Sequence, residues 1–123
     1  MAKILIVDDE PPIRCLLREL LEQDGHEVCE AENGAVALHM FRSDHFDLLI
    51  TDLVMPEQNG LNLILDIHKE QPQARIVAIS GGGGITGRFE YLPIAKLVGA
   101  IQVVEKPFDR ESLQSAVNAA LAA

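Results

Sequence analysis

The chain has 123 residues, of which 48% are hydrophobic and 24% are charged, and its formal net charge at pH 7 is −9. These values suit a single globular domain that folds without a disulfide or metal staple, and the acidic balance argues against direct nucleic-acid binding. No apolar run reaches the ~18 residues of a membrane span and the N-terminal sequence does not look like a signal peptide, so we expect a cytoplasmic protein with no membrane contact.

The chain opens with a short apolar run, KILIV (3–7), which predicts a strand. Apolar residues then recur at the spacing of one helix face: Ile13, Leu16, Leu17, Leu20 and Leu21. Prolines at 11–12 suit the first turn of this helix, and Gly25 suits its end.

The middle of the chain repeats this alternation. EVCEA (27–31) predicts a second strand, and Asn33 is placed to cap the helix that follows. FDLLIT (46–51) predicts a third strand, and a helix is expected from around Leu61 to Glu70.

The last third contains two further strands. RIVAIS (75–80) predicts the fourth, and IQVV (101–104) the fifth. Between them the glycine-rich sequence favours a long loop and then a short helix over 91–98, because glycine costs ~1 kcal/mol in a helix interior. A final helix is expected from near Asp109 to Leu121.

Strands that alternate with single helices predict right-handed crossovers and a parallel sheet. The runs at 46–51 and 75–80 are continuously apolar, which is typical of central strands covered on both faces. We therefore predict one doubly wound α/β domain over 1–123, with five parallel strands, helices on both faces and no effector domain in this chain.

Such sheets bind ligands at the carboxyl ends of their strands. The residues at the ends of four of the predicted strands are Asp8, Asp9 and Glu10, then Asp52, then Ser80, and then Glu105, Lys106 and Pro107. Each has an ordinary role when taken alone, such as a helix-dipole partner, a turn residue or a surface lysine. Their gathering at one edge predicts a site with clustered carboxylates, a hydroxyl and an ammonium group.

This set of groups supports a specific chemistry. Clustered carboxylates repel one another unless a cation is present, and oxygen ligands favour a hard ion such as Mg²⁺. A carboxylate can act as a covalent nucleophile toward phosphorus. A metal, a lysine and a hydroxyl would then neutralise charge on the transferring phosphoryl group, so the site is predicted to accept a phosphoryl group.

Several motifs carry a family resemblance: VDDE at 7–10, ITDLVMPEQNG at 50–60, AIS at 78–80, GA at 99–100 and KPF at 106–108. With these motifs the chain resembles, along its whole length, the receiver domain of two-component response regulators, in particular the single-domain chemotaxis regulators. The resemblance implies the flavodoxin-like strand order 2-1-3-4-5. It also implies a signalling switch that catalyses only its own phosphorylation and dephosphorylation.

The resemblance also implies roles for individual residues. Asp52 would take a phosphoryl group from a phosphohistidine on a histidine kinase or a phosphotransfer protein. Mg²⁺ would be bound directly by Asp9, by Asp52 and by the backbone carbonyl of Val54, with Asp8 acting mostly through water.

Three more residues would respond to the phosphoryl group. Lys106 would pair with it, the hydroxyl of Ser80 would turn toward it, and Pro107 would help to hold the lysine in the site. The resulting change of surface would bind an unknown downstream protein.

The sequence departs from the family pattern in two places. Val103 stands three residues before the lysine, where receiver domains often have an aromatic switch residue. Four glycines also follow Ser80: Gly81, Gly82, Gly83 and Gly84. A nucleotide-binding P-loop would need a Gly-Lys pair, which the chain lacks, so we interpret the glycines as a hinge loop over 81–91 that orders on phosphorylation.

Two other functional classes use similar parts. Phosphatases of the haloacid dehalogenase type need an acid two positions after the nucleophile, where this chain has Val54. A constitutive interaction module would use the fold without phosphorylation, and the complete set of site residues argues against it.

Overall fold

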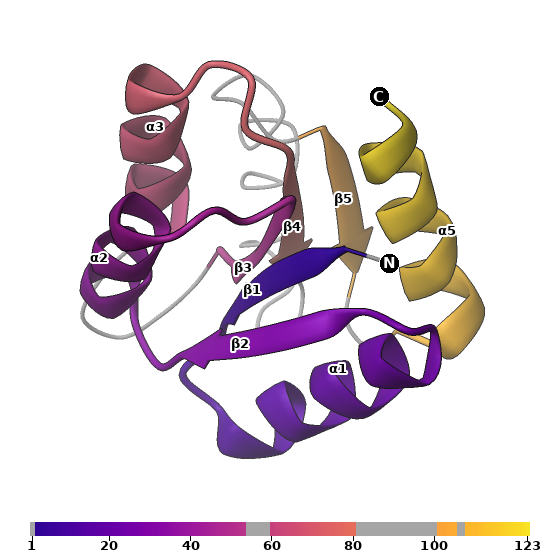
Figure 1. The fold of residues 1–123 in the computed structure, drawn as a ribbon. Coiled ribbons are helices and arrows are strands. Elements are labelled where there is room, and N and C mark those ends of the chain that lie inside the picture. Colours follow the sequence, from indigo (N-terminus) through magenta and orange to yellow (C-terminus); the bar gives the residue numbers. More distant parts are fainter. Residues whose placement is uncertain (1, 54–59, 81–100, 106–107) are drawn as a thin grey trace.

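The computed structural model describes residues 2–53, 60–80, 101–105 and 108–123. These residues contain a parallel five-stranded sheet of the order β2-β1-β3-β4-β5 (Figure 1). The strands are β1 (Lys3–Val7), β2 (Glu27–Ala31), β3 (Leu48–Asp52), β4 (Ile76–Ser80) and β5 (Gln102–Glu105). The predicted fold class and strand order are confirmed.

The described helices are α1 (Pro11–Gln23), α2 (Gly34–Ser43), α3 (Gly60–Glu70) and α5 (Arg110–Ala122). α1 and α5 cover one face of the sheet, and α2 and α3 cover the other (Figure 1). The short helix predicted over 91–98 and the hinge loop over 81–91 lie outside the described residues.

The two faces of the sheet have separate cores, because neighbouring residues of a strand point to opposite sides. On β3, Leu49 packs into the cluster beneath α2 and α3, while Leu48 and Ile50 pack into the cluster beneath α1 and α5. All three side chains are fully buried. This double coverage explains why β3 is apolar without alternation.

Two helices begin at side-chain caps: Asn33, which the sequence predicts as a cap, and Asp109, near which the last helix was expected to start. The backbone N–H of Val36 donates to Oδ1 of Asn33 at 2.9 Å, and that of Ser112 donates to Oδ1 of Asp109 at 2.7 Å. The hydrogen bond from the Ser112 backbone holds the pKa of Asp109 below its usual value. Gly25 follows the end of α1, as the sequence predicts. The helix stops at Gln23, and Gly25 takes a φ of +87°, which glycine tolerates.

The third strand begins later than its apolar run predicts. Phe46 and Asp47 precede β3, which starts at Leu48 and includes Asp52. The ring of Phe46 stacks on that of Phe41 with a centroid distance of 6.0 Å, so its hydrophobicity serves packing outside the strand. Within the described part of the chain, no helix is long and apolar enough to span a membrane.

Candidate metal centre

Three carboxylates meet at the carboxyl ends of β1 and β3. Asp8, Glu10 and Asp52 each offer an oxygen atom, and these atoms lie within 4.8 Å of one another. Asp8 is fully buried and Asp52 is only 6% exposed, whereas Glu10 is exposed. We call these three residues the acidic cluster.

The turn after β1 holds Asp8 at several points. Its backbone N–H donates to the carbonyl of Ala31 at 3.3 Å, which continues the β1–β2 pairing beyond the strand. Its Oδ1 accepts the backbone N–H of Glu10 at 2.9 Å, and its own carbonyl accepts Nη1 of Arg14 at 2.6 Å. Asp8 is therefore fixed at its amide, its carboxylate and its carbonyl.

Asp52 is fixed by its place in a central strand. It lies opposite Ile79 in the β3–β4 register, and the next residue, Leu53, donates its N–H to the carbonyl of Ile79 at 2.9 Å. The buried hydroxyl of Thr51 donates to the carbonyl of Asp52 at 3.0 Å. The sheet thus fixes the backbone from which this carboxylate projects.

The structure gathers only part of the predicted ligand set. Asp8 and Asp52 lie together as expected, and the third member of the acidic cluster is Glu10, whereas Asp9 does not belong to it. The Val54 carbonyl, the other predicted ligand, lies outside the described residues. Glu10 was visible in the sequence as an acid after β1, and its backbone N–H donates to Oδ1 of Asp8 in the turn that carries both residues.

The other predicted site residues are only partly described. The backbone of Ser80 ends β4 and lies opposite Glu105 of β5, at the same edge of the sheet as the acidic cluster. Lys106, Pro107 and the glycines at 81–84 lie outside the described residues. Val103 is partly buried against the core beneath α2 and α3, as a packing residue.

The donor set of the acidic cluster fits a hard divalent cation. All three groups are carboxylates, and oxygen donors are the ligands that Mg²⁺ and Ca²⁺ prefer. Two of the three are buried, so their mutual repulsion is poorly screened by solvent. A bound cation would offset this repulsion.

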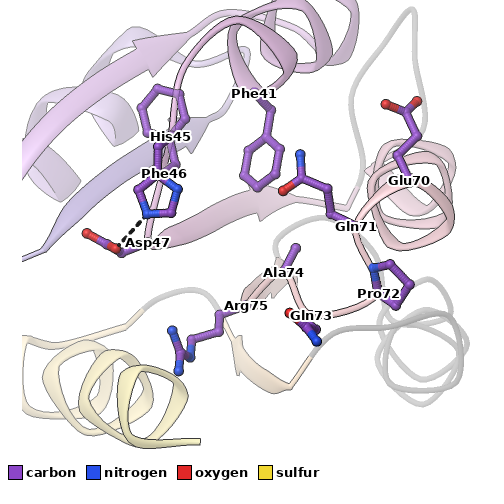
Figure 2. Close-up of a pocket in the computed structure, with 10 residues that line it drawn as sticks. All are labelled: Phe41, His45, Phe46, Asp47, Glu70, Gln71, Pro72, Gln73, Ala74 and Arg75. Carbon is purple, nitrogen blue, oxygen red and sulfur yellow. Dashed lines mark hydrogen bonds and ion pairs between the residues drawn. The ribbon is translucent and has the colours of Figure 1, made fainter.

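A pocket of about 570 Å³ lies at the opposite edge of the sheet, before β3 and β4 (Figure 2). Its ionisable lining residues already have partners within the chain. His45 Nε2 lies 3.2 Å from Asp47 Oδ1, Glu70 pairs with Arg42, and Arg75 Nη2 donates to the carbonyl of Ala123 at 2.8 Å. This pocket therefore lacks the concentration of like charge that marks the acidic cluster.

Comparisons with known proteins agree with this arrangement. A family model described as the response regulator receiver domain matches residues 4–118. The DNA-binding transcriptional regulator NtrC of Azospirillum brasilense is 38% identical over a match that covers 98% of this chain and 24% of NtrC. The chemotaxis protein CheY of Bacillus subtilis is 34% identical over 120 residues, which cover 97% of each chain.

A solved structure is similar over the same length. The response regulator TrrA of Thermotoga maritima, in complex with Mg²⁺–BeF, superposes with a TM-score of 0.85 at 36% identity, covering 98% of this chain and 99% of TrrA. The chain thus spans about a quarter of NtrC but nearly the whole of CheY and TrrA.

Proposed function

The chain belongs to the response regulator receiver domain family, and from that premise we propose that Asp52 is the phosphoryl acceptor of a two-component signalling switch. Receiver domains of this family act with histidine kinases and downstream targets. The donor proposed here is a phosphohistidine on a histidine kinase or phosphotransfer protein. The recipient of the signal is a protein that recognises the phosphorylated surface.

The observation that carries this proposal is the position of Asp52 within the acidic cluster. Its carboxylate lies at the end of a central strand, 6% exposed, with oxygens of Asp8 and Glu10 within 4.8 Å. A carboxylate oxygen would attack the phosphorus atom, an O–P bond would form, and the P–N bond to the imidazole would break. Water would later hydrolyse the acyl phosphate, releasing inorganic phosphate and restoring Asp52.

We propose Mg²⁺ as the cation of the acidic cluster. The oxygen-only donor set supports this choice, and so does the Mg²⁺–BeF complex of TrrA. When bound, the ion would neutralise part of the charge on the phosphoryl oxygens. Two ligand sets compete: Asp8, Glu10 and Asp52 are brought together in the structure, whereas the family resemblance favours Asp9, Asp52 and the Val54 carbonyl. Comparing the Mg²⁺ affinities of Glu10→Gln and Asp9→Asn distinguishes them.

The remaining residues of the site keep the roles that the resemblance implies. Lys106 would pair with the phosphoryl group, Ser80 would donate its hydroxyl to it, and Pro107 would shape the backbone beside the lysine. The chain would catalyse only its own phosphorylation and dephosphorylation and would not turn over free phosphate esters.

The test is labelling with a radioactive small phosphodonor in the presence of Mg²⁺. Asp52→Asn should abolish the covalent incorporation of label into the protein, because Asp52 is the one member of the acidic cluster that is itself a strand residue, at the end of central strand β3. Asp47→Asn, at the opposite edge of the sheet, is the matched control and should label like the wild type. Undiminished labelling of Asp52→Asn would place the nucleophile elsewhere.

A further inference from the structure

Arg14 links the acidic cluster to the neighbouring strand β2. We propose that Arg14 is a positioning residue, which keeps Asp8 and Glu10 gathered around Asp52 while the metal is absent. The inference rests on the proposed function, because it assigns a role in assembling the metal centre. Arg14 lies outside the acidic cluster and is no ligand candidate.

The contacts of Arg14 close the whole turn between β1 and α1. Its side-chain Nη1 donates to the carbonyl of Asp8 at 2.6 Å, and its backbone N–H donates to the carbonyl of Glu10 at 3.1 Å. The side chain is only 17% exposed. The side chain of Arg14 therefore supports the Asp8 carbonyl, while the Glu10 carbonyl accepts the backbone N–H groups of Ile13 and Arg14 in the first turn of α1.

The guanidinium of Arg14 is itself oriented by Glu30 of β2. Its Nε donates to Oε1 of Glu30 at 3.2 Å, and the other carboxylate oxygen, Oε2, accepts Nε of Arg18 at 2.6 Å. The hydrogen bond from Arg18, followed by the charge of Arg18 and the contacts of Arg14, holds the pKa of Glu30 below its usual value. Glu30 is thus an ionised anchor on a strand that pairs directly with β1.

This anchoring matters because the acidic cluster opposes its own assembly. Carboxylates within 4.8 Å of one another repel, and a loosely held turn would let Asp8 and Glu10 move away from Asp52. A metal ion would then have to gather them again on binding, and its affinity would fall. The cationic group of Arg14, placed on the Asp8 carbonyl, opposes this separation both by its hydrogen bond and by its charge.

Arg18 provides a matched control within the same helix. Both arginines project from α1 to the same carboxylate of Glu30, but of the two only Arg14 donates to the Asp8 carbonyl. Arg14→Gln and Arg18→Gln each remove one cation and one bond to Glu30. Arg14→Gln also removes the bond to the Asp8 carbonyl, in the turn that carries the acidic cluster, whereas Arg18→Gln also removes a bond to Glu22 within α1.

The experiment measures Mg²⁺ binding to the full chain by calorimetry. Arg14→Gln should weaken Mg²⁺ binding by roughly 10-fold or more, the range typical for residues that orient metal ligands, whereas Arg18→Gln should stay close to the wild type. Labelling by the small phosphodonor should be slow for Arg14→Gln at limiting Mg²⁺ and recover at saturating Mg²⁺. Arg14→Lys, which retains a cationic donor, should regain part of the lost affinity.

Each outcome has a distinct meaning. Equal Mg²⁺ affinity in Arg14→Gln and Arg18→Gln would overturn the inference and reduce Arg14 to a helix–strand ion pair. If Arg14→Gln fails to fold, the affinity of Arg14→Lys decides: a value below that of Arg18→Gln supports the inference, and an equal value overturns it. A wild-type chain that neither binds Mg²⁺ nor labels would instead overturn the proposed function.

Discussion

The two edges of the sheet arrange their charges in opposite ways. At the amino edge, which comprises the residues around the starts of β1, β3 and β4, carboxylates lie beside basic side chains. Lys3 pairs with Asp44, and His45 lies 3.2 Å from Asp47. At the carboxyl edge, by contrast, the three carboxylates of the acidic cluster lie within 4.8 Å of one another.

The difference separates charges that serve the fold from charges that serve a ligand. Exposed ion pairs contribute only ~0–1 kcal/mol each, and they need nothing from outside the chain. Two buried carboxylates less than 5 Å apart repel by about 3 kcal/mol at an effective dielectric constant of 20. A fold that retains such repulsion at Asp8 and Asp52 does so where a cation or a phosphoryl group changes the balance. The sign of a charge mutation should therefore differ between the two edges.

The largest expected effect is a loss of stability from a substitution in the middle of β3, between the two edges, which should leave Mg²⁺ binding unchanged. Leu49 is fully buried in the middle of β3, so Leu49→Ala should lower the free energy of unfolding by about 2–5 kcal/mol. Chemical denaturation measures this loss, and Mg²⁺ binding to the folded variant should be unchanged. Leu65→Ala, on an exposed side chain of α3, is the control and should stay within about 0.5 kcal/mol of the wild type. A cost below 1 kcal/mol for Leu49→Ala would contradict the two-sided core.

The next effect is a gain of stability at the carboxyl edge. Asp8→Asn keeps the Oδ1 acceptor for the Glu10 N–H but removes one charge from the acidic cluster. The metal-free free energy of unfolding should rise by about 1–3 kcal/mol, while the stabilisation that Mg²⁺ gives the wild type should disappear. Denaturation with and without Mg²⁺ measures both changes.

The matched variant at the amino edge is Asp44→Asn. It removes the charge of one of the two carboxylates that pair with Lys3 and should lower stability slightly, with the response to Mg²⁺ unchanged. If Asp8→Asn and Asp44→Asn shift stability in the same direction, the contrast between the two edges fails.

The order of strands and helices was largely predictable from the sequence, because the hydrophobic pattern that marks each element reflects which of its residues are buried. KILIV matches β1 residue for residue, since the acids that follow it end the apolar run. The start of β3 was misplaced because an apolar run does not reveal which of its members lie in the strand. Phe46 is buried through its contact with Phe41, and a hydrophobicity pattern contains no information about that ring contact.

The site was predictable in its location but not in its detail. Asp8 and Asp52 follow from the rule that parallel strands bring their carboxyl ends to one edge. The inclusion of Glu10 depends on the turn that its N–H makes with Asp8, and the contact of Arg14 with the Asp8 carbonyl depends on the path of a long side chain. Such contacts are set by backbone angles and rotamers, which residue spacing does not specify.

The smallest expected effect is a dependence of stability on pH at the amino edge. The backbone N–H of Lys3 donates to Oδ2 of Asp47 at 2.8 Å, and this bond, together with His45, holds the pKa of Asp47 below the ordinary value of 3.8. A carboxylate with a depressed pKa contributes stability above its unfolded pKa, and the contribution is lost as the pH falls through the folded value. Asp47→Asn keeps an acceptor for Lys3 but does not titrate.

Melting curves from about pH 2 to pH 6 test this contribution. The wild type should be slightly more stable than Asp47→Asn above about pH 4, and the two curves should converge at lower pH as the carboxylate of the wild type is protonated. Mg²⁺ binding at neutral pH should be the same in both proteins, because Asp47 lies at the edge opposite the acidic cluster. Equal stability of the two proteins at every pH would show that an uncharged acceptor serves as well, so that the hydrogen bond from the Lys3 N–H, rather than the charge of Asp47, stabilises the amino edge.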